Sequence, residues 1–173
     1  KQKTAYEIYQ CDWSSDVCSS DLTAQPIGSL PGVMQHTLDS LSKEVRDLVG
    51  MGIRSVILFG VPATKDETGS GAHDPDGIAQ RALARLRAEH GDNLVIMADL
   101  CVDEYTSHGH CGVLDKHGNV DNDRTLDVYC RAALAQAGAG AHVVAPSGMM
   151  DGQVGAIRAA LDGAGHHDVA IMA

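Results

Sequence analysis

After residue 35, segments with apolar residues at helical spacing alternate with short, continuous apolar runs. Helical segments share apolar side chains three or four positions apart, and these segments cover residues 36–50, 74–90, 121–137 and 151–161. Each is followed by a short apolar run rich in β-branched residues, beginning near residues 53, 94, 141 and 169. Runs of this kind are typical of strands buried on both faces. In the second segment, Asp74 and Pro75 are expected to start the helix, because proline fits the first helical turn.

A helix before every buried strand predicts an α/β fold with a parallel sheet. Two architectures share this pattern, an open doubly wound sheet and a (β/α)₈ barrel. No Gly-x-Gly-x-x-Gly follows the first strand, so a dinucleotide-binding fold has no support. A complete barrel typically takes about 250 residues. We therefore expect a partial (β/α)₈ TIM barrel, roughly the first half, with an extended arm at residues 23–35 and a hairpin at 113–120.

The first 22 residues differ from the rest of the chain. Ser14-Ser15-Asp16 recurs as Ser19-Ser20-Asp21, and no amphipathic period runs through the segment. The segment also lacks the apolar core of a secretory signal. It resembles translated sequencing-library adapter. We interpret residues 1–22 as an artefactual or disordered tail and residues 23–173 as a single partial-barrel domain.

Charge and cysteine content narrow the possible partners. The formal net charge is −10, with 23 acidic and 13 basic residues and no basic patch, which argues against a nucleic-acid partner. No apolar run approaches the roughly 18 residues that a membrane span requires. The domain contains three cysteines, an odd number, and these indicate thiols or metal ligands in a reducing, cytoplasmic compartment.

Polar residues follow the second and third predicted strands. The carboxyl ends of parallel strands carry the active sites of such folds. Asp99 lies at the first of these ends and could bind an ammonium group or relay a proton. Ser147 lies at the second end and could hydrogen-bond a substrate. A salt bridge or helix cap for Asp99, and a simple turn for Ser147, are equally compatible with the spacing.

A possible metal site follows the second strand. Cys101 and Cys111 enclose Asp103 and His110, and two thiolates with a carboxylate and an imidazole can surround one cation. This donor set suits Zn²⁺ better than Mg²⁺. A buried, unreactive cysteine and ordinary loop histidines give the same sequence pattern, so the spacing alone leaves both interpretations open.

Several separated motifs run in order from about Pro26 to Ala173, which is essentially the whole domain. They are Pro31-Gly32-Val33, residues 58–62, residues 93–112 with Thr106-Ser107-His108-Gly109, residues 144–147, residues 149–152 and Gly155-Ala156-Ile157-Arg158. Together these motifs resemble the 5-aminolevulinate dehydratase (porphobilinogen synthase) family.

The resemblance implies a lyase (hydro-lyase) that condenses two 5-aminolevulinate molecules into porphobilinogen for porphyrin and heme biosynthesis. It implies a TIM barrel with an N-terminal arm, a homo-octamer and two catalytic lysines that form Schiff bases. Asp99 matches an active-site aspartate and Ser147 an active-site serine. Cys101 and Cys111 match two of three zinc cysteines, and His110 matches a histidine that can join a further metal site. The resemblance also allows for Mg²⁺ in addition to Zn²⁺.

Two departures from the family pattern change these expectations. Asp103 replaces the middle cysteine, so we expect weaker Zn²⁺ binding than an all-cysteine site gives. The domain contains only Lys43, Lys65 and Lys116, and none follows a strand directly, whereas Schiff-base chemistry needs an amine at the strand end. We therefore expect an inactive piece of a longer synthase.

Two alternatives belong to other classes. One is a non-catalytic zinc-binding α/β module in which Cys101, Asp103 and Cys111 are structural. The other is an aldolase-like barrel that uses Lys65 as its amine, which has little support because Lys65 lies well past its strand.

Overall fold

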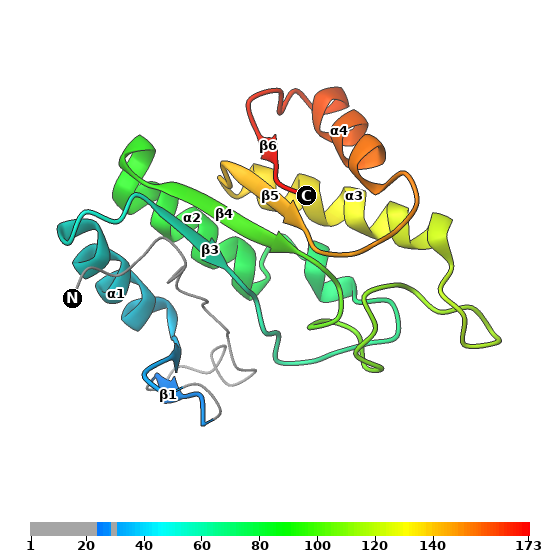
Figure 1. Cartoon of the computed structure of the whole chain (residues 1–173), viewed down its shortest axis with the longest axis horizontal. Coiled ribbons are helices and arrows are strands. Elements are labelled where there is room, and N and C mark those ends of the chain that lie inside the picture. The colour runs from blue at the N-terminus through cyan, green and yellow to red at the C-terminus, as the bar shows by residue number, and fades with distance from the viewer. Residues whose placement is uncertain (1–23, 29–30) are drawn as a thin grey trace.

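Four parallel strands form the central sheet of the computed structural model, in the order β3-β4-β5-β6 (Figure 1). The model describes residues 24–28 and 31–173, and the predicted tail at residues 1–22 lies outside the described residues. The strands are β3 (Ser55–Leu58), β4 (Val95–Leu100), β5 (Val143–Pro146) and β6 (Ala170–Ile171). Because spatial order equals chain order, each strand pairs with the next strand along the sequence.

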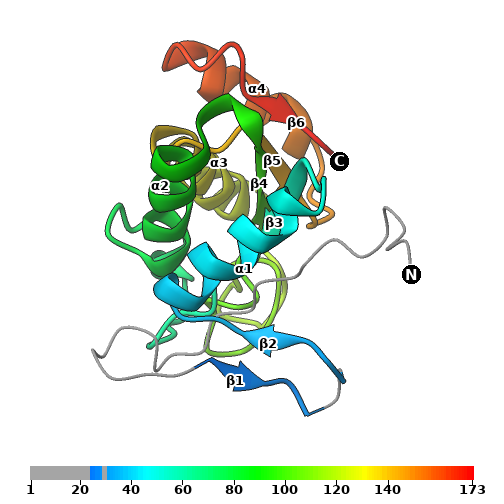
Figure 2. The same cartoon turned by 90° about the vertical axis from the view of Figure 1, so that its left-hand side faces the viewer.

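A helix precedes each strand, as the periodicity predicts. The helices are α1 (Leu38–Gly50), α2 (Ile78–His90), α3 (Asn122–Gly138) and α4 (Gln153–Gly163). Helices α2 and α3 lie along the same face of the sheet (Figure 2). The start of α1 is set by Thr37, whose hydroxyl accepts a hydrogen bond from the Ser40 amide in a capping box.

One face of the sheet packs against the helices, and Asp99 lies on the other face. Val56, Ile96, Leu100 and Val144 point toward the helices and are buried in the core. Residues alternate along a strand, so Asp99 points to the opposite face of the sheet from Leu100. In a closed barrel that opposite face is the interior. The fold thus places the first predicted active-site residue on the face expected for a barrel active site.

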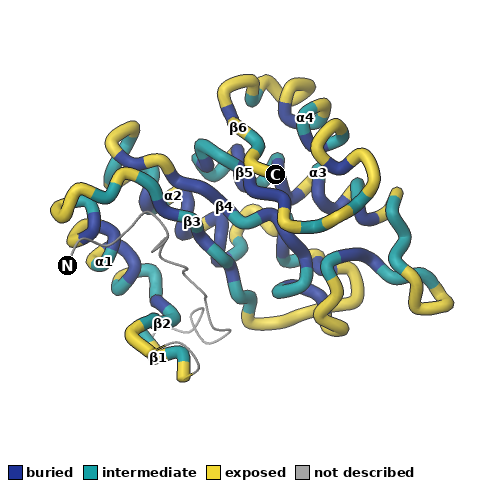
Figure 3. The backbone as a smooth tube through the Cα atoms, in the orientation of Figure 1, coloured by how far each residue is buried: buried dark blue, intermediate teal, exposed yellow. Residues whose placement is uncertain are grey.

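Apolar packing divides into two clusters that meet at β4, and most of β4 and β5 is buried (Figure 3). The first cluster joins α1, α2, β3 and β4, with Leu48, Leu83 and Leu86 fully buried. The second joins α3 and α4 to β5 and the end of β4, around Tyr129 and Ile157. The second cluster lies directly beneath the strand exits that carry the polar residues.

The prediction that Asp74 and Pro75 start a helix is wrong by one turn. The Asp74 carboxylate instead accepts a hydrogen bond from the Asp76 amide, and the Asp74 carbonyl accepts one from Gly77 at 2.9 Å. This local turn competes with the helix, as short polar side chains do. Helix α2 then begins after Gly77, whose carbonyl accepts the first helical hydrogen bond from Arg81.

The predicted arm and hairpin both contain short antiparallel pairings. Strands β1 (Gln25–Pro26) and β2 (Met34–Gln35) pair within the arm. Leu114 and Val120 form an antiparallel bridge, which confirms the hairpin expected at residues 113–120. No helix in the described part of the chain has the length and apolar character needed to cross a membrane.

Candidate active site and metal centre

The exits of β4 and β5 bring the two predicted active-site residues together. Asp99 pairs with Ala145 in the parallel register, which places Ser147 just beyond the end of the neighbouring strand. The Ser147 hydroxyl donates a hydrogen bond to Oδ1 of Asp99 at 3.0 Å. The strand register therefore explains how residues 48 positions apart in sequence become direct neighbours.

A buried glutamine fixes the backbone at this strand exit. Gln136 is 3% exposed and its side-chain amide donates to the Asp99 carbonyl at 2.7 Å. Gln136 comes from α3, so the helix behind the sheet holds the strand end in place. The side-chain oxygen of Gln136, Oε1, is buried without a hydrogen-bond partner among the described residues.

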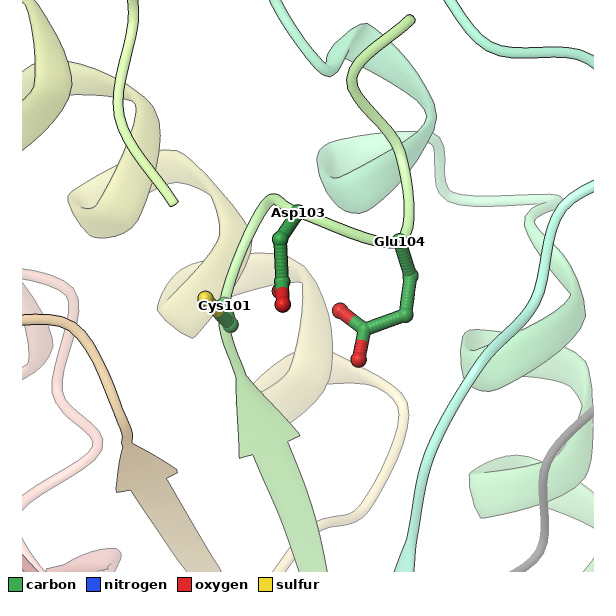
Figure 4. Close-up of side chains that lie close together, drawn as sticks. All are labelled: Cys101, Asp103 and Glu104. Atoms are coloured by element: carbon green, nitrogen blue, oxygen red, sulfur yellow. The ribbon is translucent and has the colours of Figure 1, made fainter. Parts of the chain in front are cut away.

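Three potential metal ligands converge immediately after β4. One ligand atom each from Cys101, Asp103 and Glu104 lies within 4.8 Å of the other two, and the carboxylate of Glu104 extends toward Asp103 (Figure 4). Oδ1 of Asp103 and Oε2 of Glu104 are buried and have no hydrogen-bond partner in the part of the chain that the structure describes. Buried oxygens without partners are costly, and a cation would satisfy both.

The protonation of this group follows from burial and from the proximity of two acids. Burial raises the pKa of the Cys101 thiol to about 12, so the thiol stays protonated at neutral pH until a cation replaces its proton. Burial and the adjacent Asp103 carboxylate raise the pKa of Glu104 to about 8. Burial alone would also raise the pKa of Asp103, but interactions with Glu104 and Cys101 outweigh it and lower that pKa. Without a cation, the two acids together hold a proton at neutral pH.

The remaining predicted ligands, His110 and Cys111, lie outside this three-residue group. They instead line a neighbouring cavity of about 310 Å³, together with Met149, Met150 and Asp151 among others. The structure thus brings together two of the four predicted ligands, Cys101 and Asp103. Their role in metal binding stays a prediction.

Glu104 is the member of the group that the sequence analysis missed. In an extended strand, neighbouring side chains point to opposite faces, so adjacent acids would not both face one ion. After β4 the chain turns instead, and the amides of Tyr105 and Thr106 both donate to the Val102 carbonyl, at 3.0 and 2.8 Å. The only sequence signal was the adjacent acidic pair itself.

Tyr129 connects the two cysteines that the sequence analysis selected. It is fully buried on α3, its hydroxyl lies 3.4 Å from the Cys101 sulfur, and it donates to the Cys111 carbonyl at 3.1 Å. One side chain therefore holds both ends of the loop between residues 101 and 111.

Thr125 fixes the next part of the chain, between residues 113 and 121. Its hydroxyl accepts a hydrogen bond from the Val113 amide at 2.9 Å and donates to the Asp121 carbonyl at 2.6 Å. Thr125→Val keeps the shape but leaves the buried Val113 amide without a partner. We expect a loss of about 1–3 kcal/mol in the free energy of unfolding, measured by urea denaturation.

The matched control for Thr125 is Thr64, which is exposed. Thr64→Val should change the free energy of unfolding by no more than about 0.5 kcal/mol. Equal effects of the two substitutions would contradict the assigned role of the Thr125 hydroxyl.

None of the lysines in the described residues lies at a strand exit. Lys43 lies on α1, Lys65 in the loop after β3 and Lys116 in the hairpin, and all three side chains are exposed. Schiff-base chemistry needs an amine that reaches the substrate at the strand exits, and none of these three lysines provides one. Lys65 lies seven residues beyond the end of β3, so the geometry adds no support to an aldolase-like site.

Comparisons with known proteins point to one family. The family model for delta-aminolevulinic acid dehydratase matches residues 15–173, which includes the last part of the segment set aside as a tail. A delta-aminolevulinic acid dehydratase of Streptomyces coelicolor is 58% identical over 150 residues, covering 86% of this chain and 46% of that relative. The corresponding protein of Mycobacterium tuberculosis is 55% identical over 151 residues.

The fold is also similar to that of a solved structure. The delta-aminolevulinic acid dehydratase of Toxoplasma gondii, in complex with the reaction product porphobilinogen, has a TM-score of 0.85 and 35% identity. The match covers 94% of this chain and 46% of that chain. The partial TIM barrel expected from the sequence is confirmed, and the chain spans about half the length of the relatives it matches. The chain belongs to the delta-aminolevulinic acid dehydratase family.

Proposed function

We propose that the exits of β4 and β5 form part of the active site of a porphobilinogen synthase, a lyase that condenses two 5-aminolevulinate molecules. The observation that carries the proposal is the hydrogen bond between Asp99 and Ser147, beside the group of Cys101, Asp103 and Glu104, in a member of this family. The Toxoplasma gondii relative binds porphobilinogen, which supports a ligand of the same chemistry here.

Each active-site residue has a role that its chemistry permits. The Asp99 carboxylate accepts hydrogen bonds, so it can bind a substrate ammonium group or take up a proton from it. Ser147 already donates to Asp99, and its oxygen remains free to accept a hydrogen bond from a substrate. The Gln136 amide holds the backbone of Asp99, so the pair keeps one orientation while substrate enters.

We propose Zn²⁺ as the metal, bound by Cys101 and Asp103, with His110 and Cys111 as further ligands from the loop that follows. The buried oxygens without partners and the adjacent thiol fit a divalent cation, and the thiol favours zinc over Mg²⁺, which the resemblance allows only as an additional metal. When bound, Zn²⁺ would supply Lewis-acid polarisation of a substrate oxygen. Asp103 in place of a thiolate leads us to expect weaker zinc binding than three cysteines give.

We further propose that the 173-residue chain makes no porphobilinogen by itself, because its described lysines are exposed and away from the strand exits. The family resemblance also leads us to propose a homo-octamer and a cytoplasmic location for the longer protein. The three described cysteines are free thiols, which agrees with a reducing compartment.

A chimeric enzyme tests the proposed active site. Residues 23–173 would replace the matching part of the Streptomyces coelicolor relative, and porphobilinogen formation would be measured by colorimetric assay. We expect the chimera to be active, and we expect Asp99→Asn to lower kcat by about 100-fold or more, because general acid–base groups contribute about that much. The isolated chain serves as the inactive reference.

Asp47→Asn is the matched control, since Asp47 is an exposed residue of α1 far along the chain from the strand exits. It should leave kcat unchanged. An active chimera whose kcat is the same with Asp99→Asn as with Asp47→Asn would refute the role of Asp99. Porphobilinogen formation by the isolated chain would refute its proposed inactivity.

A further inference from the structure

Glu104 occupies a position where a third metal ligand would be expected. We infer that its carboxylate binds the proposed metal together with Cys101 and Asp103, so that the exit of β4 alone supplies three ligands. This inference rests on the proposed metal site and deepens it, because the ligands expected from the sequence do not include Glu104.

The first observation is the distance between the donor atoms. One ligand atom each from Cys101, Asp103 and Glu104 lies within 4.8 Å of the other two. In a tetrahedral shell, ligands about 2.0–2.3 Å from the zinc ion lie about 3.3–3.8 Å from one another, so these donor atoms would move closer together to bind one ion. His110 and Cys111 are not part of the group.

The second observation is the state of the carboxylate oxygens. Oε2 of Glu104 is buried and lacks a hydrogen-bond partner among the described residues, as does Oδ1 of Asp103. A side chain that only filled space at this strand exit would not require a buried carboxyl group. Two carboxylates side by side repel each other when both are ionised, and a divalent cation between them removes that repulsion.

The third observation is how the chain holds Glu104 in place. The turn after β4 is closed by the amides of Tyr105 and Thr106, which both donate to the Val102 carbonyl. Tyr105 and Thr106 are themselves buried, so the backbone next to Glu104 is anchored in the core. The ligand is therefore presented by an ordered turn, as pre-organised metal sites require.

Cobalt titration of the whole chain tests the role of Glu104. Co²⁺ reports thiolate ligation through a near-ultraviolet charge-transfer band, and its visible bands report the number and geometry of the ligands. We expect Glu104→Gln, which keeps the side-chain shape, to weaken Co²⁺ binding by about tenfold or more, since even groups that only support ligands contribute 10–100-fold. The charge-transfer band should persist at saturating Co²⁺, because Cys101 remains.

Two further variants separate the possible results. Glu67→Gln removes the same charge from an exposed loop residue and should leave Co²⁺ affinity within about twofold of the wild type. Cys111→Ser should weaken Co²⁺ binding less than Glu104→Gln does, because Cys111 lies outside the three-residue group and would join the metal only from the loop that follows. Circular dichroism of each variant shows whether the fold is kept.

Each outcome decides a separate claim. If Glu104→Gln binds Co²⁺ as tightly as Glu67→Gln does, Glu104 is no ligand and the inference is overturned, while the metal site stands. If Cys101→Ser leaves both affinity and the charge-transfer band unchanged, the proposed metal site itself fails. A wild-type chain that binds no Co²⁺ overturns both.

Discussion

Leu100→Ala is expected to lower the free energy of unfolding by about 2–5 kcal/mol, because it removes a large side chain from a packed core and leaves a cavity. Leu100 is fully buried at the end of β4, between Asp99 and Cys101 in sequence, and it belongs to the cluster around Tyr129. Its side chain supports the strand exit from the helix side. Urea denaturation followed by circular dichroism measures the loss.

Val95→Ala at the other end of β4 is the matched control. Val95 is 41% exposed, so the same kind of truncation should cost much less than at Leu100. Similar losses at both positions would mean that the packing beneath the strand exit does not stabilise the fold in the way described.

Gly148→Ala is expected to cost about 1–3 kcal/mol, the usual range for overpacking a core, and to displace Tyr129. A Cβ at position 148 would overlap the Tyr129 hydroxyl and lie 2.8 Å from its Cζ atom. Tyr129 is fully buried and cannot move aside without losing its contacts with Cys101 and Cys111. Because Gly148 has no side chain, it leaves space for Tyr129, which holds both ends of the loop between residues 101 and 111.

A double-mutant cycle with Tyr129→Phe isolates this contact. The phenylalanine keeps the ring and removes the overlapping oxygen, so Gly148→Ala should cost less in the Tyr129→Phe background than in the wild type. Gly155→Ala is the control, because Gly155 lies within α4 and a Cβ there meets nothing within 4 Å. It should stabilise the helix by about 0.5–1 kcal/mol. If the effects of Gly148→Ala and Tyr129→Phe on the free energy of unfolding were additive, the proposed packing of the Tyr129 hydroxyl against Gly148 would be wrong.

The order of helices and strands was predictable because each element has a strong local signal. The strands at 55–58 and 95–100 lie inside the apolar runs that begin near residues 53 and 94, and each helix begins within four residues of its expected start. The error at Asp74 arose where a side chain competes with the helix for backbone hydrogen bonds. Such competition depends on tertiary context, and the pattern of apolar positions does not reveal it.

The candidate site was less predictable than the fold. The pairing of Asp99 with Ser147 follows from parallel strands ending at one edge, and it could be expected from the chain order. The grouping of Glu104 with Cys101 and Asp103 depends on a turn that reverses the alternation of side chains. The separation of Cys111 from that group depends on the path of a long loop held by Tyr129 and Thr125, which spacing in sequence does not determine.

X-ray absorption spectroscopy of the zinc-loaded chain tests the central claim most directly, namely that the exit of β4 forms a metal site around Cys101. We expect one Zn²⁺ per chain with a sulfur ligand at about 2.3 Å and oxygen or nitrogen ligands at about 2.0–2.2 Å. The sulfur contribution should disappear or fall sharply in Cys101→Ser. A zinc shell without sulfur, or a sulfur contribution unchanged by Cys101→Ser, would contradict the account.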